Sequence, residues 1–426
     1  MSELTMHAKE AKEASHILSC LDTEQKNKAL LNIKDALCKN RESIFEANKK
    51  DLEKAIEDKL PDPIVKRLKF NEDKLNDVVS GIESLIGLAD PVNEIKLHTE
   101  LSEGLDLYRV TCAIGVLGII FESRPDALVQ IASLALKSGN AVLLKGGSEA
   151  KNTNAILASV IYEAGVESGL PEGWLYLITA RSEVNEMLAL NQYIDLIIPR
   201  GSNEFVQYIM KNTTISVLGH ADGVCHTYID DKADKELAKK IAIDAKTQYV
   251  SVCNATETIL INRNIGFEFV DELVEALKNA NVEIYGDDEL STRYGLEKVT
   301  EWHHEYLDYK VSMKLVDSVE EAVAHINEFG SGHSDSIITT DNAKAEYFMS
   351  AVDSGNVMFN CSTRFSDGFR YGFGAEVGVS TSKLHARGPV GLEGLVSYKY
   401  KIYGHGDIVK DFADQKRKFT HKKFDV

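Results

Sequence analysis

Apolar and polar positions follow a helical period through the first part of the chain, from about residue 3 to residue 90. Apolar side chains recur between clusters of Lys and Glu at the spacing of one face of an amphipathic helix. The positions that carry this period are Ile17, Leu18, Leu21, Leu30, Leu31, Ile33, Ala36 and Leu37. Pro61 and Pro63 interrupt the region, and Asp90-Pro91 ends it. This part of the chain is therefore predicted to be helical.

After Arg109 the pattern changes to short apolar runs that alternate with helical segments. The predicted strands cover residues 113–121, 141–144, 174–179 and 195–199, and in a second set 257–261, 282–285 and 336–339. Strands that alternate with helices are typical of doubly wound parallel sheets, so two sets predict two α/β domains. Residues 92–109 are predicted to form a short antiparallel excursion. No strand is followed by G-x-G-x-x-G, so the usual dinucleotide fingerprint is absent from the sequence.

The tail from residue 395 to 404 alternates apolar and polar residues like a strand at the edge of a sheet. An exposed edge favours pairing with another chain, so this small β flap is the predicted oligomerisation element of a homo-oligomer. We therefore divide the chain into residues 1–230, with the N-terminal helices and the first α/β domain, residues 231–394, with the second, and residues 395–426, with the flap strand and tail. The predicted fold class is α/β, with two doubly wound parallel-sheet domains and a small β flap.

Charge and composition narrow the classes of partner. The chain has 48 Lys and Arg against 66 Asp and Glu, a net charge of −18 and a pI near 5.2. This balance lacks the basic footprint that nucleic acids and anionic membranes require, so neither is an expected partner. The N-terminus has no signal-peptide pattern, and the longest apolar run, residues 112–121, is too short to span a bilayer. We expect a cytoplasmic protein that acts on a small molecule.

Cys253 is the candidate nucleophile among six cysteines, the others being Cys20, Cys38, Cys112, Cys225 and Cys361. No CxxC pair occurs, so reduced thiols are expected instead of a disulfide framework. Cys253 lies between a predicted helix and a predicted strand, flanked by small and amide residues; it is either an inert buried cysteine or a thiolate in an electropositive loop. The adjacent pair His303-His304 does not form a metal site, because neighbouring side chains diverge and no H-E-x-x-H motif exists.

Several blocks of sequence carry a resemblance to a known family. They are residues 215–220 and 225–231, the nucleophile region 246–248 and 252–258, and the C-terminal blocks 359–368, 372–381 and 385–392. Together they resemble the aldehyde dehydrogenase superfamily over residues 10–405, and within it the gamma-glutamyl phosphate reductase family. One departure is Tyr249-Val250-Ser251, where that family more often carries a basic residue, proline and glycine.

The resemblance implies a reductase that uses NADPH. In this mechanism Cys253 attacks the acyl phosphate of L-glutamyl 5-phosphate and forms a thioester, which hydride transfer converts to L-glutamate 5-semialdehyde. This is the second step of proline biosynthesis from glutamate, and a separate glutamate kinase is the expected supplier of the substrate. Hydrolytic aldehyde dehydrogenases activate water with a glutamate, whereas Val217 occupies the matching position and has no basic group. The thioester is therefore expected to escape hydrolysis.

The same resemblance assigns roles to individual residues. The expected catalytic residues are Cys253, Asn254 and, where the superfamily has its oxyanion asparagine, Ser123. The expected cofactor-binding residues are Lys145, Gly146, Gly147, Ser148, Glu149, Arg200, Gly201, Ser202 and Glu305. The substrate carries a carboxylate and a phosphate, which guanidinium groups bind with two hydrogen bonds, so Arg124, Arg364 and Arg387 are the expected substrate-binding residues.

Two alternatives stay open from the sequence. A phosphate- or coenzyme-A-dependent aldehyde dehydrogenase acting on another acyl group would use the same chemistry at Cys253. A non-catalytic scaffold that keeps the fold would bind no NADPH and would have no reactive thiol.

Overall fold

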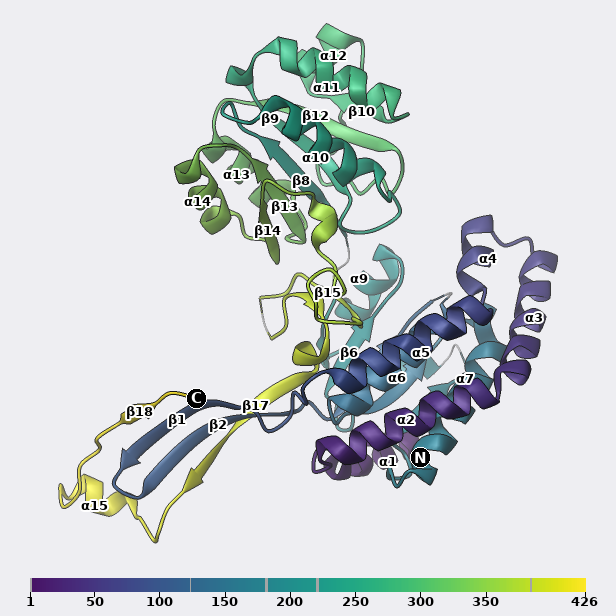
Figure 1. The fold of residues 1–426 in the computed structure, drawn as a ribbon, viewed down its shortest axis with the longest axis vertical. Helices are drawn as coiled ribbons and strands as arrows, with labels where there is room; N and C mark the ends of the chain where they lie inside the picture. Colours follow the sequence, from purple (N-terminus) through teal and green to yellow (C-terminus); the bar gives the residue numbers. More distant parts are fainter. Residues whose placement is uncertain (1, 123, 181–182, 220–221, 384) are drawn as a thin grey trace.

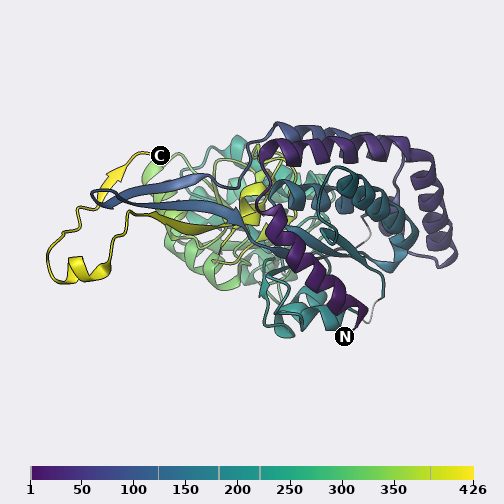
Figure 2. The ribbon, with the colours of Figure 1, turned by 90° about the horizontal axis from the view of Figure 1, so that it is seen from below.

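The computed structural model describes residues 2–122, 124–180, 183–219, 222–383 and 385–426. Its ribbon has two lobes and a long β flap (Figure 1). The N-terminal helices and the first sheet form one lobe, and the second sheet with its helices forms the other. The flap projects from the first lobe, on the side away from most of the N-terminal helices (Figure 2).

The chain begins with a run of amphipathic helices, as predicted. They are α1 (Glu3–Leu18), α2 (Thr23–Lys39), α3 (Arg41–Glu57), α4 (Asp62–Leu68) and α5 (Glu72–Gly87). The Ser2 side chain caps α1 by accepting a hydrogen bond from the Thr5 amide. At the start of α2, Asp22 and Gln25 form a reciprocal capping box. These caps satisfy amide groups that have no partner within the helix.

The first sheet lies under these helices. Its strands are β3 (Val116–Ile120), β4 (Ala141–Lys145), β5 (Leu175–Ile178), β6 (Leu196–Pro199) and β7 (Ser216–Val217). The strand order is β5-β4-β3-β6-β7, and every neighbouring pair is parallel. The connecting helices are α6 (Pro125–Lys137), η1 (Ser148–Ala150), α7 (Lys151–Glu167), α8 (Glu183–Leu188) and α9 (Asn203–Lys211). Since α6 packs on α5, and α7 packs on α2 and α3, the N-terminal helices form an additional outer layer.

The second lobe is also a doubly wound parallel sheet. Its strands are β8 (Cys225–Ile229), β9 (Thr256–Asn262), β10 (Glu283–Gly286), β11 (Glu297–Lys298), β12 (Lys310–Val316), β13 (Ser334–Ile338) and β14 (Asn356–Phe359). The order is β11-β10-β12-β9-β8-β13-β14, with parallel pairing throughout. The helices are α10 (Lys235–Thr247), η2 (Arg263–Ile265), α11 (Phe267–Asn279), α12 (Asp288–Tyr294), α13 (Val319–Phe329) and α14 (Asn342–Ala351).

The flap is an antiparallel sheet built from distant parts of the chain. Its strands are β1 (Ile95–Ser102), β2 (Leu105–Ala113), β17 (Val396–Tyr403) and β18 (Lys422–Phe424), in the order β17-β2-β1-β18. The predicted antiparallel excursion and edge strand are both confirmed, because β17 pairs only with β2 among the described strands. The short helix α15 (Val409–Ala413) leads to β18, which the sequence did not predict.

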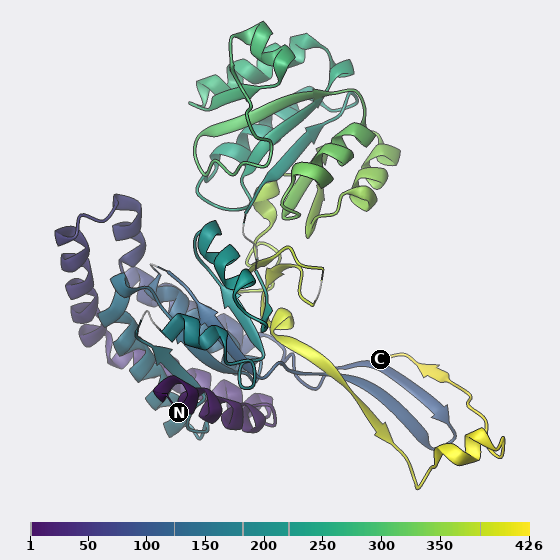
Figure 3. The same cartoon turned by 180° about the vertical axis from the view of Figure 1, so that it is seen from behind.

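One segment links the two lobes a second time. After β14 the chain passes through η3 (Thr363–Phe365), β15 (Gly378–Ser380), β16 (Gly388–Val390) and η4 (Leu392–Leu395), and then enters β17. Val377, Val390 and Leu395 from this segment are buried in the core of the first lobe. Figure 3 shows the segment between the lobes.

The sheets divide the chain differently from the predicted ranges. A boundary after residue 230 would separate β8 from its partners β9 and β13, so the second lobe begins before Cys225. The flap includes the β1–β2 hairpin as well as residues after 395, and the linking segment returns to the first lobe before 394. The predicted fold class is nevertheless confirmed. Within the described ranges, none of the helices has the length and hydropathy that a bilayer crossing requires.

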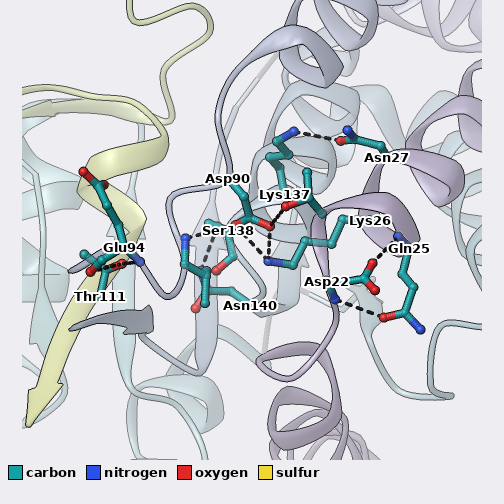
Figure 4. Close-up of polar contacts among 12 residues, drawn as sticks. Asp22, Gln25, Lys26, Asn27, Asp90, Glu94, Thr111, Lys137, Ser138 and Asn140 are labelled. Atoms are coloured by element: carbon teal, nitrogen blue, oxygen red, sulfur yellow. Dashed lines mark hydrogen bonds and ion pairs between the residues drawn. The ribbon is translucent and has the colours of Figure 1, made fainter. Parts of the chain in front are cut away.

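A buried polar cluster fastens α2 and α6 to the root of the flap (Figure 4). The Lys26 ammonium, fully buried, contacts both carboxylate oxygens of Asp90 at 3.0 and 2.9 Å. The Lys137 ammonium donates to Asn27 Oδ1 at 2.7 Å and to the Ile86 carbonyl at 3.3 Å. Burial lowers the pKa of Lys137, and Asp90 opposes that shift. Removing the Asp90 carboxylate would therefore leave Lys26 buried without its counter-ion.

Candidate active site

Cys253 lies in the loop between the C-terminal end of α10 and the start of β9. Its side chain is half-buried, and the loop closes on itself through a hydrogen bond from the Ala255 amide to the Val252 carbonyl, 3.1 Å long. The loop therefore lies at the start of β9, beside the start of β8, where Cys225 is paired with Thr256.

The segment that links the lobes holds the residue after the nucleophile. Thr363 Oγ1 donates to the Asn254 carbonyl at 2.8 Å, and Asn254 Nδ2 donates to the Ser366 carbonyl at 2.7 Å. The Thr363 hydroxyl also lies 3.2 Å from that of Thr256, at the start of β9. Asn254 is thus fixed through both its backbone and its side chain.

Two arginines, Arg364 and Arg200, lie within electrostatic range of the Cys253 thiol. Arg364 is largely buried, and its Nε donates to Gln248 Oε1 at 3.0 Å. Burial lowers the pKa of Arg364, with nearby Arg370 adding to the shift, and Asp367 and Cys253 oppose it. The Cys253 sulfur is therefore within electrostatic reach of the Arg364 guanidinium.

Arg200, at the end of β6, also lies close to Cys253. Burial lowers the pKa of Arg200, the neighbouring Arg124 adds to the shift, and Glu376 and Cys253 oppose it. The sequence assigned Arg200 to the cofactor and Arg124 to the substrate, and the structure places these two arginines near each other, with Arg200 also close to Cys253. Arg124 is exposed and is the N-cap residue of α6 in the first lobe.

The structure does not bring Arg387 into contact with this group among the described interactions. Its Nη2 donates to the Asp353 carbonyl at 3.0 Å and to Asp353 Oδ1 at 3.1 Å. Lys383 forms a second ion pair with the same carboxylate. Arg387 thus stabilises the end of α14, where Asp353 lies.

The predicted cofactor residues follow the end of β4. Lys145 is buried and donates from Nζ to the Gly146 carbonyl at 2.8 Å. A Cβ at Gly146 would lie 2.2 Å from Asn154 Nδ2, so only glycine fits there. Ser148 and Glu149 then form η1 and line a cavity of about 560 Å³ together with Glu122, Lys54 and Lys151. This hollow lies at the carboxyl end of the strands, where open α/β sheets bind ligands.

Asp51 from α3 shapes this cofactor region. Its two carboxylate oxygens accept from the Asn152 and Thr153 amides at 3.1 and 2.7 Å, and from both side chains at 2.8 and 2.6 Å. The carboxylate is buried and neutralises the positive end of α7. The N-terminal helices therefore hold the start of α7, immediately after η1.

The turn after β6 contains the other predicted pyrophosphate residues. Arg200 is followed by Gly201 and by Ser202, which is the N-cap of α9. A Cβ on Gly201 would lie 3.2 Å from the Glu122 carboxyl carbon, so the ends of β3 and β6 approach closely. Because β3 lies between β4 and β6, the Lys145 and Arg200 turns share one edge of the sheet.

Glu305 precedes β12 and is half-buried. Burial raises the pKa of Glu257 to about 7, Lys246 opposes this shift, and the nearby charge of Glu305 adds to it. The Leu307 amide donates to Glu257 Oε1 at 3.2 Å, and Ser251 Oγ donates to the Leu307 carbonyl at 3.4 Å. The segment that contains Glu305 is therefore packed against the Cys253 loop.

Three further predictions concern Ser123, Val217 and the histidine pair. Ser123 lies outside the described residues. Val217 ends β7, half-buried against the apolar core of the first lobe. His303 Nδ1 donates to the Phe329 carbonyl at 2.8 Å. Among the residues that the structure describes, no group of three His, Cys, Asp or Glu side chains could hold a metal ion.

The sequence reasoning missed several residues around the thiol. Thr363, Cys225 and Glu376 were not assigned a role, although the Glu376 carboxylate accepts from the Gly368 amide at 2.9 Å and lies near Arg200. All of them fall inside blocks that carry the family resemblance, which is the one signal that could have drawn attention to them. Their residue types alone do not distinguish them from ordinary core or turn positions.

Comparisons with known proteins agree with this geometry. The model of the aldehyde dehydrogenase family matches residues 2–295 and 311–397. A gamma-glutamyl phosphate reductase of Acetivibrio thermocellus is 60% identical over 97% of this chain and 96% of its own length. A crystal structure of gamma-glutamyl phosphate reductase from Thermotoga maritima is 40% identical, with a TM-score of 0.93 over 96% of this chain and 100% of the other.

A second solved relative differs in shape at the same identity. The gamma-glutamyl phosphate reductase of Saccharomyces cerevisiae is also 40% identical and covers 96% of this chain and 99% of its own, with a TM-score of 0.55. The family match extends over more than half of the chain, and these relatives are covered almost completely. The chain therefore belongs to the aldehyde dehydrogenase family, and within it to the gamma-glutamyl phosphate reductases, which makes it an oxidoreductase.

Proposed function

We propose that this protein reduces L-glutamyl 5-phosphate to L-glutamate 5-semialdehyde and phosphate with NADPH, through a thioester on Cys253. This is the second step of proline biosynthesis from glutamate. The observation that carries the proposal is that Arg200 from one lobe and Arg364 from the other both lie within electrostatic range of the half-buried Cys253 thiol. An acyl phosphate needs such a site, because its reacting carbon is attached to a dianionic leaving group.

The first step is the attack of the Cys253 thiolate on the acyl carbon. The S–C bond forms while the C–O bond to phosphate breaks, and phosphate leaves with the bonding electron pair. The nearby guanidinium groups stabilise both the thiolate and the departing phosphate by direct charge interaction. Arg364 is the best placed of them, since its hydrogen bond to Gln248 fixes its orientation. Arg387 is already engaged by Asp353 and is the least suited to this task.

The developing oxyanion requires hydrogen-bond donors in a fixed position. The backbone amides of the Cys253 loop supply them, because Thr363 and Ser366 anchor the loop through Asn254. Ser123 is a candidate side-chain donor, as the family resemblance implies. A fixed donor costs no reorganisation when charge develops, and this supports a role for the linking segment in catalysis.

The residues at the carboxyl edge of the first sheet fit a dinucleotide. Gly146 leaves room that a Cβ would fill, Lys145 supplies a cation, and Ser148 and Glu149 line the adjoining cavity. Gly201 and Ser202 precede α9, whose N-terminal amides suit a pyrophosphate. Glu305 would contact the nicotinamide ribose. NADPH bound there would supply the hydride that reduces the thioester to the aldehyde.

Water must not intercept the thioester. Val217 stands where hydrolytic relatives have a glutamate, and a valine cannot remove a proton from water. Its side chain packs against the apolar core of the first lobe, which is consistent with a role in excluding water. Acyl transfer to phosphate in the reverse direction is therefore favoured over release of a free acid.

The proposal extends to the cellular setting. A separate glutamate kinase supplies the acyl phosphate, and the enzyme acts in the cytoplasm as a homo-oligomer. The exposed side chains of Tyr398, Tyr400 and Ile402 on the edge strand β17 support association through the flap.

The reverse reaction tests the proposal. Glutamate 5-semialdehyde, NADP and inorganic phosphate are supplied, and the absorbance of NADPH is followed. We expect NADPH to form only when phosphate is present, and Cys253→Ser to abolish turnover while NADP binding persists. NADPH formation that is equally fast without phosphate would contradict the acyl phosphate mechanism, and activity of Cys253→Ser would contradict the nucleophile.

A further inference from the structure

A second cysteine contacts the backbone of the nucleophile. Cys225, at the start of β8, is completely buried, and its Sγ lies 3.1 Å from the Cys253 carbonyl oxygen. A carbonyl oxygen can only accept, so the Cys225 thiol is the donor. Burial raises the pKa of Cys225 well above its usual value, with Asp335 and Cys253 adding to the shift, so the thiol keeps its proton.

The chain just before Cys225 presses against the same peptide. A Cβ on Gly223 would lie 2.1 Å from the Cys253 carbonyl oxygen and 2.4 Å from its Cα. No side chain fits in that space, so the backbone around Gly223 lies in direct contact with Cys253. Gly223 and Cys225 thus form a support under one face of the nucleophile, built by β8 and the residue pair before it.

This support determines the direction of the neighbouring amide. In a planar trans peptide, the carbonyl and the following N–H point in opposite directions. The Cys253 carbonyl points toward Cys225, so the Asn254 N–H points away from β8. The next carbonyl, that of Asn254, is held by Thr363 Oγ1. Two consecutive carbonyls are therefore fixed by side chains from different elements.

We propose that Cys225 is a positioning residue, whose thiol holds the Cys253–Asn254 peptide and so fixes the backbone from which the nucleophile projects. The inference rests on the proposed function and deepens it, because it names the group that orients the nucleophile's backbone. Cys225 takes no part in bond making itself. Its effect should appear in the chemical step and not in substrate binding.

A purely structural cysteine would behave differently. If Cys225 only filled space in the core, any side chain of suitable volume would serve equally well. If its hydrogen bond matters, variants that retain a hydrogen-bond donor at position 225 should keep a higher kcat than variants that do not. Cys225→Ser keeps a donor, whereas Cys225→Ala and Cys225→Val do not, and Val fills the volume that Ala leaves empty.

The experiment measures kcat and KM for these variants in the reverse assay, with Cys112→Ala in strand β2 as the control. We expect Cys225→Ala and Cys225→Val to lower kcat about tenfold with KM for NADP nearly unchanged, and Cys225→Ser to recover most of it. The control should match the native enzyme. Native kcat in Cys225→Val, or a Cys225→Ser variant as impaired as Cys225→Val, would overturn the inference. If Cys225→Ala or Cys225→Val fails to fold, the other is compared with Cys225→Ser; if Cys225→Ser fails to fold, the native enzyme is the donor form against which Cys225→Val is compared.

A second readout separates this inference from the proposed function. The rate at which iodoacetamide alkylates Cys253, followed by mass spectrometry of the peptide, needs no substrate. We expect this rate to change about threefold or more in Cys225→Val and to return to the native value in Cys225→Ser. An unchanged rate in Cys225→Val would overturn the positioning role even if the enzyme is active. A native protein inactive in the reverse assay would instead overturn the proposed function.

Discussion

The Lys246 ammonium and the Glu257 carboxylate form an ion pair 2.6 Å long in which both side chains are fully buried. Lys246 lies in the last turn of α10 and Glu257 in the second position of β9, so the pair closes the loop that carries Cys253. Burial lowers the pKa of Lys246 and raises that of Glu257, and each partner opposes the shift of the other. The two ends of the Cys253 loop are thus joined by an ion pair in which each partner favours the charged form of the other.

Breaking this pair should destabilise the protein strongly. Glu257→Gln leaves the Lys246 ammonium buried without a counter-charge, and removal of one partner of a buried pair costs about 3–5 kcal/mol. Urea denaturation measures the effect. The matched control is Glu272→Gln, which breaks the Lys239–Glu272 pair, also 2.6 Å long but at the surface. The control should change stability little. If the two substitutions lowered the free energy of unfolding equally, burial would not be what makes the Lys246–Glu257 pair important.

Removing the Asp51 carboxylate should weaken both α7 and cofactor binding. Asp51→Ala leaves the Asn152 and Thr153 amides without their acceptor, at a cost of about 2–3 kcal/mol. Because η1 adjoins this helix start, KM for NADPH should rise while kcat changes little. Asp51→Asn should restore part of both losses. Glu53→Gln, on the same helix but exposed and outside the cavity lining, is the control. An unchanged KM for NADPH in Asp51→Ala would show that Asp51 on α3 does not influence cofactor binding.

Stability should fall in acid because of His325. Burial lowers the pKa of His325 from 6.5 to about 2, with further contributions from His226 and Lys314. Between pH 6.5 and pH 2 the histidine is protonated in the unfolded chain but neutral in the folded chain. The free energy of unfolding is therefore highest above pH 6.5 and declines as the pH falls toward 2. Between pH 7 and pH 5 this group should remove about 2 kcal/mol.

The His325 effect is measured by urea denaturation across this pH range. His325→Phe keeps an aromatic ring against Trp302 and Phe329 and removes the titrating group. Its stability should depend less steeply on pH than that of the native protein. His16→Gln, an exposed histidine at the end of α1, should leave the dependence as it is. A native slope in His325→Phe would show that another group dominates.

Arg364 should affect the phosphate and not the cofactor. Arg364→Lys keeps the charge but loses the planar group that is fixed by Gln248, so KM for phosphate in the reverse assay should rise about tenfold. The dissociation constant of NADP should stay the same. Arg263→Lys, in a surface pair with Glu289, is the control and should leave both values unchanged. A weaker affinity for NADP in Arg364→Lys would place this arginine at the cofactor instead.

The sequence predicted the elements whose pattern is mainly apolar. Strands β3, β4 and β6 fall at the predicted ranges 113–121, 141–144 and 195–199, which were found from continuous apolar runs. Strand β8 was missed because Cys225-His226-Thr227-Tyr228-Ile229 looks polar, yet every residue in it is buried. Its buried polar side chains form hydrogen bonds with other strands of the sheet. His226 Nδ1, for example, lies 3.0 Å from Asp335 Oδ1 on β13. Partners so far apart in sequence cannot be inferred from local pattern.

The site shows the same limit. The sequence predicted Arg364 beside Cys253 but gave no reason to expect Arg200 near the same thiol. Arg387 lies in an equally distinctive block, and only the fold reveals Asp353 as its partner. Hydrogen bonds between residues that are tens of positions apart decide which charged side chains face a ligand and which stabilise a helix end.

The second lobe is inserted into the first, because the chain enters it between β7 and β8 and leaves it after β14. Two covalent connections permit rotation of one lobe mainly about the line that joins them. One of these connections contains Thr363 and Ser366, the residues that hold Asn254. One of the two links between the lobes is thus also the segment that anchors the Cys253 loop. Any rotation of one lobe relative to the other would therefore also displace the loop that carries Cys253.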